Sequence, residues 1–117
     1  PNPRVVDTVT VGQTPEGIFF SPDSRRLAVT VIDGSNKPQA SAFHGTARYK
    51  LFDIAGERLK PASELVGGQW LQGHAFNADG SAVLVQDAAQ RQIRLYRSQG
   101  GVLADTGERL QLDVSPA

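Results

Sequence analysis

Two histidines and two nearby aspartates are the side chains of this sequence best suited to acid–base or metal chemistry. His44 lies in a polar stretch that begins at Asp33, and His74 opens an apolar segment that leads to Asp87. Histidine exchanges protons near neutral pH and binds metals through a ring nitrogen. The spacing of these residues matches no metal-ligand motif. A loop histidine and a structural histidine are therefore the preferred interpretations, and neither a metal nor another cofactor is expected.

Trp70, the only tryptophan, is the second feature that could bind a ligand. It lies between Gln69 and Gln72 in a connection that contains two glycines. Its ring could stack on a sugar or another ligand, but packing between adjacent structural units is the favoured interpretation. No nucleophile elbow or phosphate-binding loop accompanies it, and no catalytic residue is expected. The candidate ligand-binding residues are Asp33, Asn36, His44, Trp70 and His74.

The composition of the chain limits the classes of partner that it can bind. The 117 residues carry 12 basic and 12 acidic side chains, so the chain has no electrostatic attraction for nucleic acid or for an anionic membrane. No apolar run approaches the roughly 20 residues of a membrane span. The absence of cysteine excludes disulfides and thiol catalysis. The absence of methionine and the start at Pro1 favour a processed chain or a piece of a longer protein.

The elements that must position the candidates are predicted to be strands. The chain holds 12 Gly and 7 Pro, and no segment of ten residues keeps an apolar period near 3.6, which indicates an all-β fold. Strands are expected at 5–11, 17–21, 26–32, 47–54, 58–66, 73–77, 82–86, 92–97 and from 102 to 114. The apolar faces on both sides of the strand at 17–21 predict that it is buried. Residues 33–46 have no period and form a long loop.

One hairpin of this pattern occurs twice. Residues 17–30 and 73–86 both read as two apolar strands joined by a polar turn, with Asp23 and Asp79 in equivalent places. An aspartate in such a turn accepts hydrogen bonds from backbone amides two residues on. Gly17 and Gly73 are 56 positions apart, whereas Leu51 and Leu95 are 44 apart. The sequence is therefore a unit of about 44 residues with an insertion at the long loop.

Four antiparallel strands that recur every 40 to 50 residues are typical of β-propeller blades. The predicted arrangement is a partial propeller over residues 1–117. Blade one covers 4–54 with the loop 33–46, blade two covers 58–97, and 102–114 is the first strand of a third blade. The loops 12–16, 33–46 and 67–72 are expected to share one face. The 14-residue loop 33–46 is the preferred carrier of function, because long loops in compact repeats are usually either functional or disordered.

The motif Gly-x-x-Phe-Ser-Pro-Asp-x-x-Arg-Leu-x-Val-Thr at 17–30 resembles the repeat of the YVTN-type, lactonase-like β-propellers, whose consensus is roughly G-x-A-x-(S/T)-P-D-G-K-x-x-Y-V. The resemblance extends over about two blades and one further strand. The chain departs from the consensus at Ser24 in place of Gly, Ala28 in place of Tyr, Val31 in place of Asn and Ala78 in place of Pro. The resemblance implies a fold rather than a chemistry, and it suggests a periplasmic or secreted location.

Two functions stay open at this point. A non-catalytic propeller segment that serves as a binding or interaction scaffold is the leading hypothesis, with an unidentified protein or small molecule as its ligand. The alternative is part of a lactonase-like hydrolase of sugar lactones. Redox propellers that hold haem or a quinone have no support in the motifs. Two blades cannot close a ring, so the partners expected are the remaining blades of a longer propeller or further copies of this chain.

Overall fold

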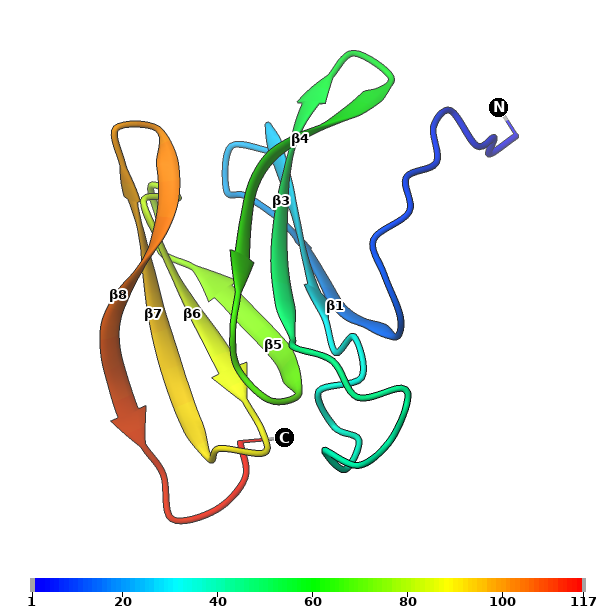
Figure 1. The fold of residues 1–117 in the computed structure, drawn as a ribbon. Coiled ribbons are helices and arrows are strands. Elements are labelled where there is room, and N and C mark those ends of the chain that lie inside the picture. Colours follow the sequence, from blue (N-terminus) through cyan, green and yellow to red (C-terminus); the bar gives the residue numbers. More distant parts are fainter. Residues whose placement is uncertain (1, 117) are drawn as a thin grey trace.

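The computed structural model describes residues 2–116 as two four-stranded antiparallel sheets that stand side by side (Figure 1). Sheet A contains β1 (Pro15–Phe20), β2 (Arg26–Val31), β3 (Arg48–Ala55) and β4 (Arg58–Val66) in sequence order. Sheet B repeats this order with β5 (Leu71–Phe76), β6 (Ala82–Asp87), β7 (Gln92–Gln99) and β8 (Val102–Gln111). The prediction of an all-β fold with two four-stranded blades is confirmed. No helix among the described residues is long and apolar enough to cross a bilayer.

The strands are divided between the sheets differently from the sequence-based expectation. Residues 58–66 were expected to open the second blade, but β4 pairs with β3 and closes sheet A. Residues 102–111 likewise pair with β7 rather than opening a third blade. The reason is the turn that precedes each of them: Gly56 and Gly100 have positive φ values of 63° and 60°, which permit tight hairpins. Each unit therefore ends one strand later than expected.

Residues 5–11, expected to be the first strand, have no strand pairing in the structure. Val9 and Val11 instead pack on the face of sheet A formed by Val29, Val31 and Phe52. The Asp7 carboxylate accepts a hydrogen bond of 2.8 Å from the Leu59 amide, which fastens the segment beside β4. The β-branched pattern that predicted a strand is thus used to cover an apolar sheet face.

The turn chemistry agrees with the expectation in both units. Asp23 Oδ1 accepts from the Arg25 amide at 3.0 Å, and Asp79 Oδ1 accepts from the Ser81 amide at 2.9 Å. The next residue in each turn has a left-handed backbone, with φ of 59° at Ser24 and 74° at Gly80. The two aspartates are therefore structural.

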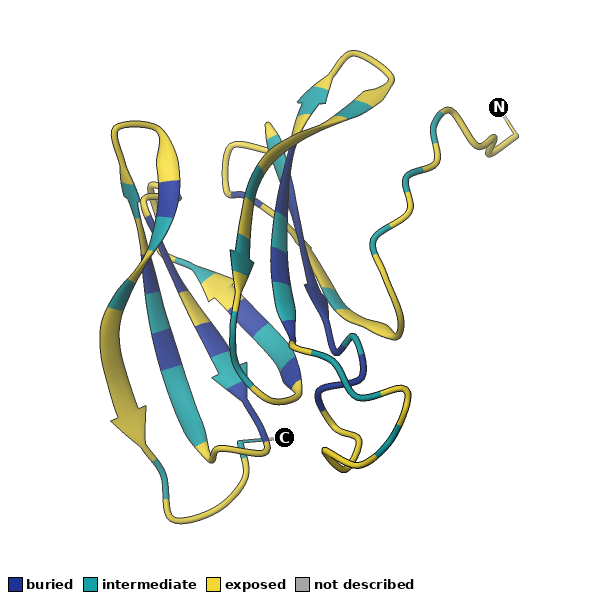
Figure 2. Cartoon of the chain, viewed as in Figure 1, coloured by how far each residue is buried: buried dark blue, intermediate teal, exposed yellow. Residues whose placement is uncertain are grey.

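The core lies between the two sheets. From sheet A it includes Ala28, Tyr49 and Leu51, and from sheet B it includes Leu71, Val83, Val85, Tyr96 and Leu103. The edge strand β1 is an exception to the predicted burial, because Ile18, Phe19 and Phe20 are more than half exposed. Figure 2 shows the same for most of β8. The apolar residues of β1 are exposed because no described residue covers that side of the edge strand.

A chain of hydrogen bonds joins the sheets at the start of β1 and β5. The register of β1 against β2 slips next to Gly17, whose amide donates to Thr30 Oγ1 at 2.8 Å instead of to a backbone carbonyl. The same hydroxyl donates to the Gln72 carbonyl in β5 at 2.6 Å. A Cβ on Gly17 would lie 2.8 Å from that carbonyl oxygen, so only glycine allows this approach. We call this contact between β1, β2 and β5 the seam.

His74 lies in the seam, beside a hollow of about 570 Å³ that it helps to line. Its Nδ1 is 2.9 Å from the Tyr49 hydroxyl, and its ring packs edge-on against the rings of Phe19 and Tyr49. The side chain is buried, and desolvation lowers its pKa to about 4, against the opposing effect of the Gly17 backbone. Burial also raises the pKa of Tyr49. His74 is therefore neutral at physiological pH.

We predict that removal of the seam hydroxyl weakens the fold. Thr30→Val keeps the side-chain shape but leaves the Gly17 amide and the Gln72 carbonyl without their partner, which should lower the free energy of unfolding by about 2–3 kcal/mol. Thr30→Ser keeps the hydroxyl and should cost less than about 1 kcal/mol. Urea denaturation measures both variants. Equal losses in the two would show that the hydroxyl does not hold the seam.

The neutral His74 should make stability depend on pH. Its folded pKa of about 4 lies below the ordinary value of 6.5, so its contribution is complete above pH 6.5 and is lost as the pH falls from 6.5 to 4. The loss from this residue should be about 3 kcal/mol. Unfolding free energies measured across this pH range should show the slope in the parent chain and in His44→Gln, but not in His74→Gln. An unchanged slope in His74→Gln would contradict this account.

Candidate functional site

The connections that hold most candidate residues gather at one edge of the two sheets, as expected. The Asp33 amide donates to the Gln13 carbonyl at 2.9 Å, which ties the long loop to the connection before β1. The Trp70 amide donates to Ser35 Oγ at 2.9 Å, which ties the same loop to the connection before β5. We call the surface formed by 12–14, 33–46 and 67–70 the loop face. It lies at the lower end of the molecule in Figure 1.

A cavity of about 650 Å³ opens on the loop face between sheet A and sheet B. Three of the five sequence candidates, Asn36, His44 and Trp70, line it together. The remaining lining residues are Ser35, Lys37, Pro38, Gln39, Gln69, Ala88, Ala89 and Ser115. The long loop therefore supplies most of the polar wall, and the second unit supplies Trp70 and the floor. Asp33 and His74 do not line this cavity.

Asp33 ties the base of the long loop to two neighbouring segments. Its carboxylate pairs with Arg48 Nε at 3.1 Å and accepts from the Gln13 amide at 3.2 Å. The backbone of Asp33 has a φ of 50°, and the chain turns away from the direction of β2 at this residue. Both contacts fix the base of the loop, and Asp33 is not among the residues that line the cavity.

His44 has a defined hydrogen-bonding role. Its Nδ1 is 2.8 Å from the Lys37 carbonyl oxygen, an acceptor, so Nδ1 carries the proton and donates. A neutral ring then has Nε2 as its acceptor. The contact closes the long loop on itself and places a polar ring beside Asn36 in the wall of the cavity.

The backbone of Trp70 is held from both sides in an uncommon conformation. Its φ of 66° is rare for a bulky residue. Ser35, which is buried, accepts from the Trp70 amide, and the Trp70 carbonyl accepts from the Ala88 amide at 3.0 Å. Thr14, the equivalent residue of the first unit, has a φ of 57°, so the conformation belongs to the repeat. What distinguishes the second unit is the indole that this conformation presents, which is 38% exposed.

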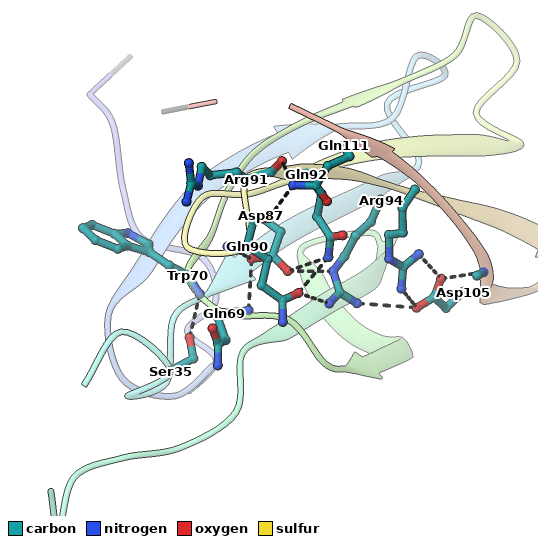
Figure 3. Close-up of polar contacts among 12 residues, drawn as sticks. Ser35, Gln69, Trp70, Asp87, Gln90, Arg91, Gln92, Arg94, Asp105 and Gln111 are labelled. Carbon is teal, nitrogen blue, oxygen red and sulfur yellow. Dashed lines mark hydrogen bonds and ion pairs between the residues drawn. The ribbon is translucent and has the colours of Figure 1, made fainter. Parts of the chain in front are cut away.

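A buried ion pair between Asp87 and Arg94 fixes the connection that carries Trp70 (Figure 3). Asp87 is fully buried, pairs with Arg94 Nε at 2.9 Å and accepts from the Gln69 amide at 3.1 Å. In Figure 3 the indole points away from this network. A Cβ on Gly68 would lie 3.0 Å from Asp87 Oδ2, so glycine gives the carboxylate room to approach. From the sequence, Asp87 was a possible partner of a histidine. In the structure, its carboxylate instead fixes the connection before β5.

Two polar residues at the start of the edge strands were missed by sequence analysis. Glu16 of β1 and Gln72 of β5 occupy equivalent positions in the two units, and Gln72 Nε2 donates to Glu16 Oε1 at 3.4 Å. The 56-residue offset that aligned Gly17 with Gly73 also aligns this pair. The signal was therefore present in the sequence. Among residues 2–116, no group of three His, Cys, Asp or Glu side chains is arranged to hold a metal ion.

Comparison with known proteins supports the fold and leaves the chemistry open. No family model matches the chain, and a search of curated proteins finds no match. Two crystal structures that resemble it come from Bacteroides fragilis and Bacteroides uniformis, and both proteins are provisionally assigned as 6-phosphogluconolactonases. The first gives a TM-score of 0.66 at 16% identity over 86% of this chain, and the second 0.67 at 17% identity over 86%.

The chain spans about a quarter of the length of these structures, 26% of the first and 27% of the second. At this level of identity the likeness concerns the fold alone. The two sheets of this chain therefore have the fold of a segment of a lactonase-type β-propeller.

Proposed function

We propose that the chain supplies two neighbouring blades of a lactonase-like β-propeller that hydrolyses a sugar lactone. The observation that carries the proposal is the likeness of both sheets, in their relative placement, to proteins assigned as 6-phosphogluconolactonases. Fold likeness by itself does not imply an activity, so the proposal also needs polar groups where a propeller binds its substrate. The non-catalytic scaffold favoured by the sequence becomes the second candidate.

Glu16 and Gln72 are the polar groups that this segment brings to the channel. Repeat-equivalent residues of successive blades lie in equivalent places around the propeller axis. The seam brings β1 and β5 together at this point, which supports the assignment of these edge strands to the inner side of the ring. Both residues stand at the end of their strands next to the loop face. They would form two positions of a polar ring at the mouth of the channel.

The chemistry of lactone opening suits this pair. Water attacks the lactone carbonyl carbon, the bond from that carbon to the ring oxygen breaks, and the ring oxygen takes up a proton to give a hydroxy acid. A carboxylate can accept the proton of the attacking water, and an amide N–H can stabilise the negative charge that develops on the carbonyl oxygen. Glu16 fits the first role and Gln72 fits the second.

The exposed face of sheet B is suited to a further blade. Leu84, which is 52% exposed, is the equivalent of Ala28, by which sheet A contacts sheet B. Ile93 and Leu95 are likewise the equivalents of Tyr49 and Leu51, which also belong to the core between the two sheets. These three residues line a hollow of about 570 Å³ on that face. We propose that a blade of the same repeat covers it and continues the ring.

The scaffold hypothesis has one specific observation in its favour, the cavity on the loop face. It contains Trp70 and several polar side chains and lies apart from Glu16 and Gln72, neither of which lines it. A protein with this cavity and no turnover would be a binding scaffold.

Hydrolysis by the complete natural protein tests the proposal. Glucono-1,5-lactone and its 6-phosphate should be opened faster than in a buffer blank when acid release is followed in a pH-stat. Glu16→Gln should lower kcat/KM about 100-fold, as expected for loss of a general base. Glu57→Gln, a carboxylate in the exposed β3–β4 turn, is the matched control and should leave kcat/KM unchanged. Rates equal to the blank for both lactones would refute the hydrolase and leave the scaffold.

A further inference from the structure

We propose that the loop-face cavity binds an acidic sugar, a hexose-sized ring that bears a carboxylate or phosphate group, with Trp70 as the surface on which the ring lies. This inference concerns a site separate from Glu16 and Gln72 and does not depend on lactone hydrolysis. Its volume of about 650 Å³ falls within the range of about 300–1,000 Å³ typical of small-molecule sites.

The first argument is the way in which Trp70 is presented. The repeat conformation that gives Trp70 its φ of 66° also gives Thr14 a φ of 57°, so the backbone alone does not require an aromatic residue there. The indole lines the cavity and stays 38% exposed. Its backbone is fixed by Ser35 and Ala88, and the neighbouring Gln69 amide is fixed by Asp87. A rigidly held, partly exposed indole offers a flat apolar face at little entropic cost to a ligand.

The second argument is the kind of polar group around the indole. Asn36, Gln39 and Gln69 each bring a side-chain amide to the lining. An amide combines a donor and an acceptor and so can bind two neighbouring hydroxyls, a pattern that sugars offer and most apolar ligands lack. A flat apolar surface faced by several amides suits a ring with C–H groups on its faces and hydroxyls on its rim.

The third argument is charge. Lys37 lines the cavity, and none of the lining residues is an aspartate or a glutamate. The carbonyl of Lys37 accepts from His44 Nδ1, which holds this part of the loop in place. The acidic residue behind the floor, Asp87, is buried and paired with Arg94. The cavity is therefore positively charged, which favours an anionic sugar over a neutral or cationic one.

The single tryptophan allows a direct test, because all indole fluorescence of the chain comes from Trp70. Titration of the 117-residue chain with glucuronate, a hexose-sized ring that bears a carboxylate, should change the fluorescence saturably. Glucose should bind with a Kd about tenfold higher, because it lacks the charge that pairs with Lys37. Sulfate, an anion without a sugar ring, should produce no change.

Variants separate the contributions of ring and charge. Lys37→Ala should raise the Kd for glucuronate about tenfold and leave that for glucose unchanged. Trp70→Gly suits the left-handed backbone and should fold, yet calorimetry should show the loss of glucuronate binding, whereas Trp70→Phe should retain part of it. Phe43→Ala is the matched control, because Phe43 is an exposed aromatic residue of the same loop that does not line the cavity.

Three results would overturn the inference. These are the absence of a fluorescence change with glucuronate, an equal change with sulfate, and full glucuronate affinity in Trp70→Gly. Because neither Trp70 nor Lys37 contacts Glu16 or Gln72 in the structure, loss of sugar binding in these variants with lactone turnover intact would support this site without bearing on the hydrolase.

Discussion

The hydroxyl of Thr30 makes the shortest of the polar contacts that join the two sheets, which also include the Tyr49–His74 and Gln72–Glu16 pairs. It accepts from Gly17 within sheet A and donates to the Gln72 carbonyl in sheet B, so that carbonyl loses this hydrogen bond when sheet A is absent. Such directional bonds fix the relative placement of two sheets more exactly than burial alone, because the hydrophobic effect has no direction. The glycine at position 17, the slip in register and the buried His74 next to Tyr49 all follow from this close approach.

Differences between the two units show where the repeat has been adapted. In the first unit the residue before β1 is Thr14 and the last residue of β2 is Val31. In the second unit the equivalents are Trp70 and Asp87. The exchange places a buried ion pair behind the connection and an indole in front of it. Burial of an ion pair is costly, and replacement by apolar residues is often neutral or stabilising. The pair at Asp87 and Arg94 is therefore explained better by the positioning of Gln69 and Trp70 than by stability.

Much of the fold was predictable because its signals are local. The turns at Asp23 and Asp79 and the hairpins that they join depend on residues within one short segment. The division of strands between the sheets was not predictable in the same way. Residues 5–11 and 58–66 carry similar patterns, yet one covers a sheet face and the other pairs with β3. An apolar period of two residues indicates an extended segment but does not show which strand that segment pairs with.

The candidate site was predictable to the extent that topology determines it. Asn36, His44 and Trp70 meet because their connections leave the sheets at one edge. The contact of His74 with Tyr49 was not predictable, because sequence does not show which side chains meet across the seam. Ser35 and Asp87 fix the backbone around Trp70 through contacts between distant segments, which no short sequence motif predicts.

Native-state hydrogen exchange tests most directly whether the seam makes the two sheets one unit. If it does, the slowest amides of β2 and β3 and those of β6 and β7 share one opening free energy, and Thr30→Val lowers it by the same amount in both sheets. If Thr30→Val accelerates exchange in sheet A and leaves sheet B unchanged, the sheets are stable independently and the seam does not have the role assigned to it here.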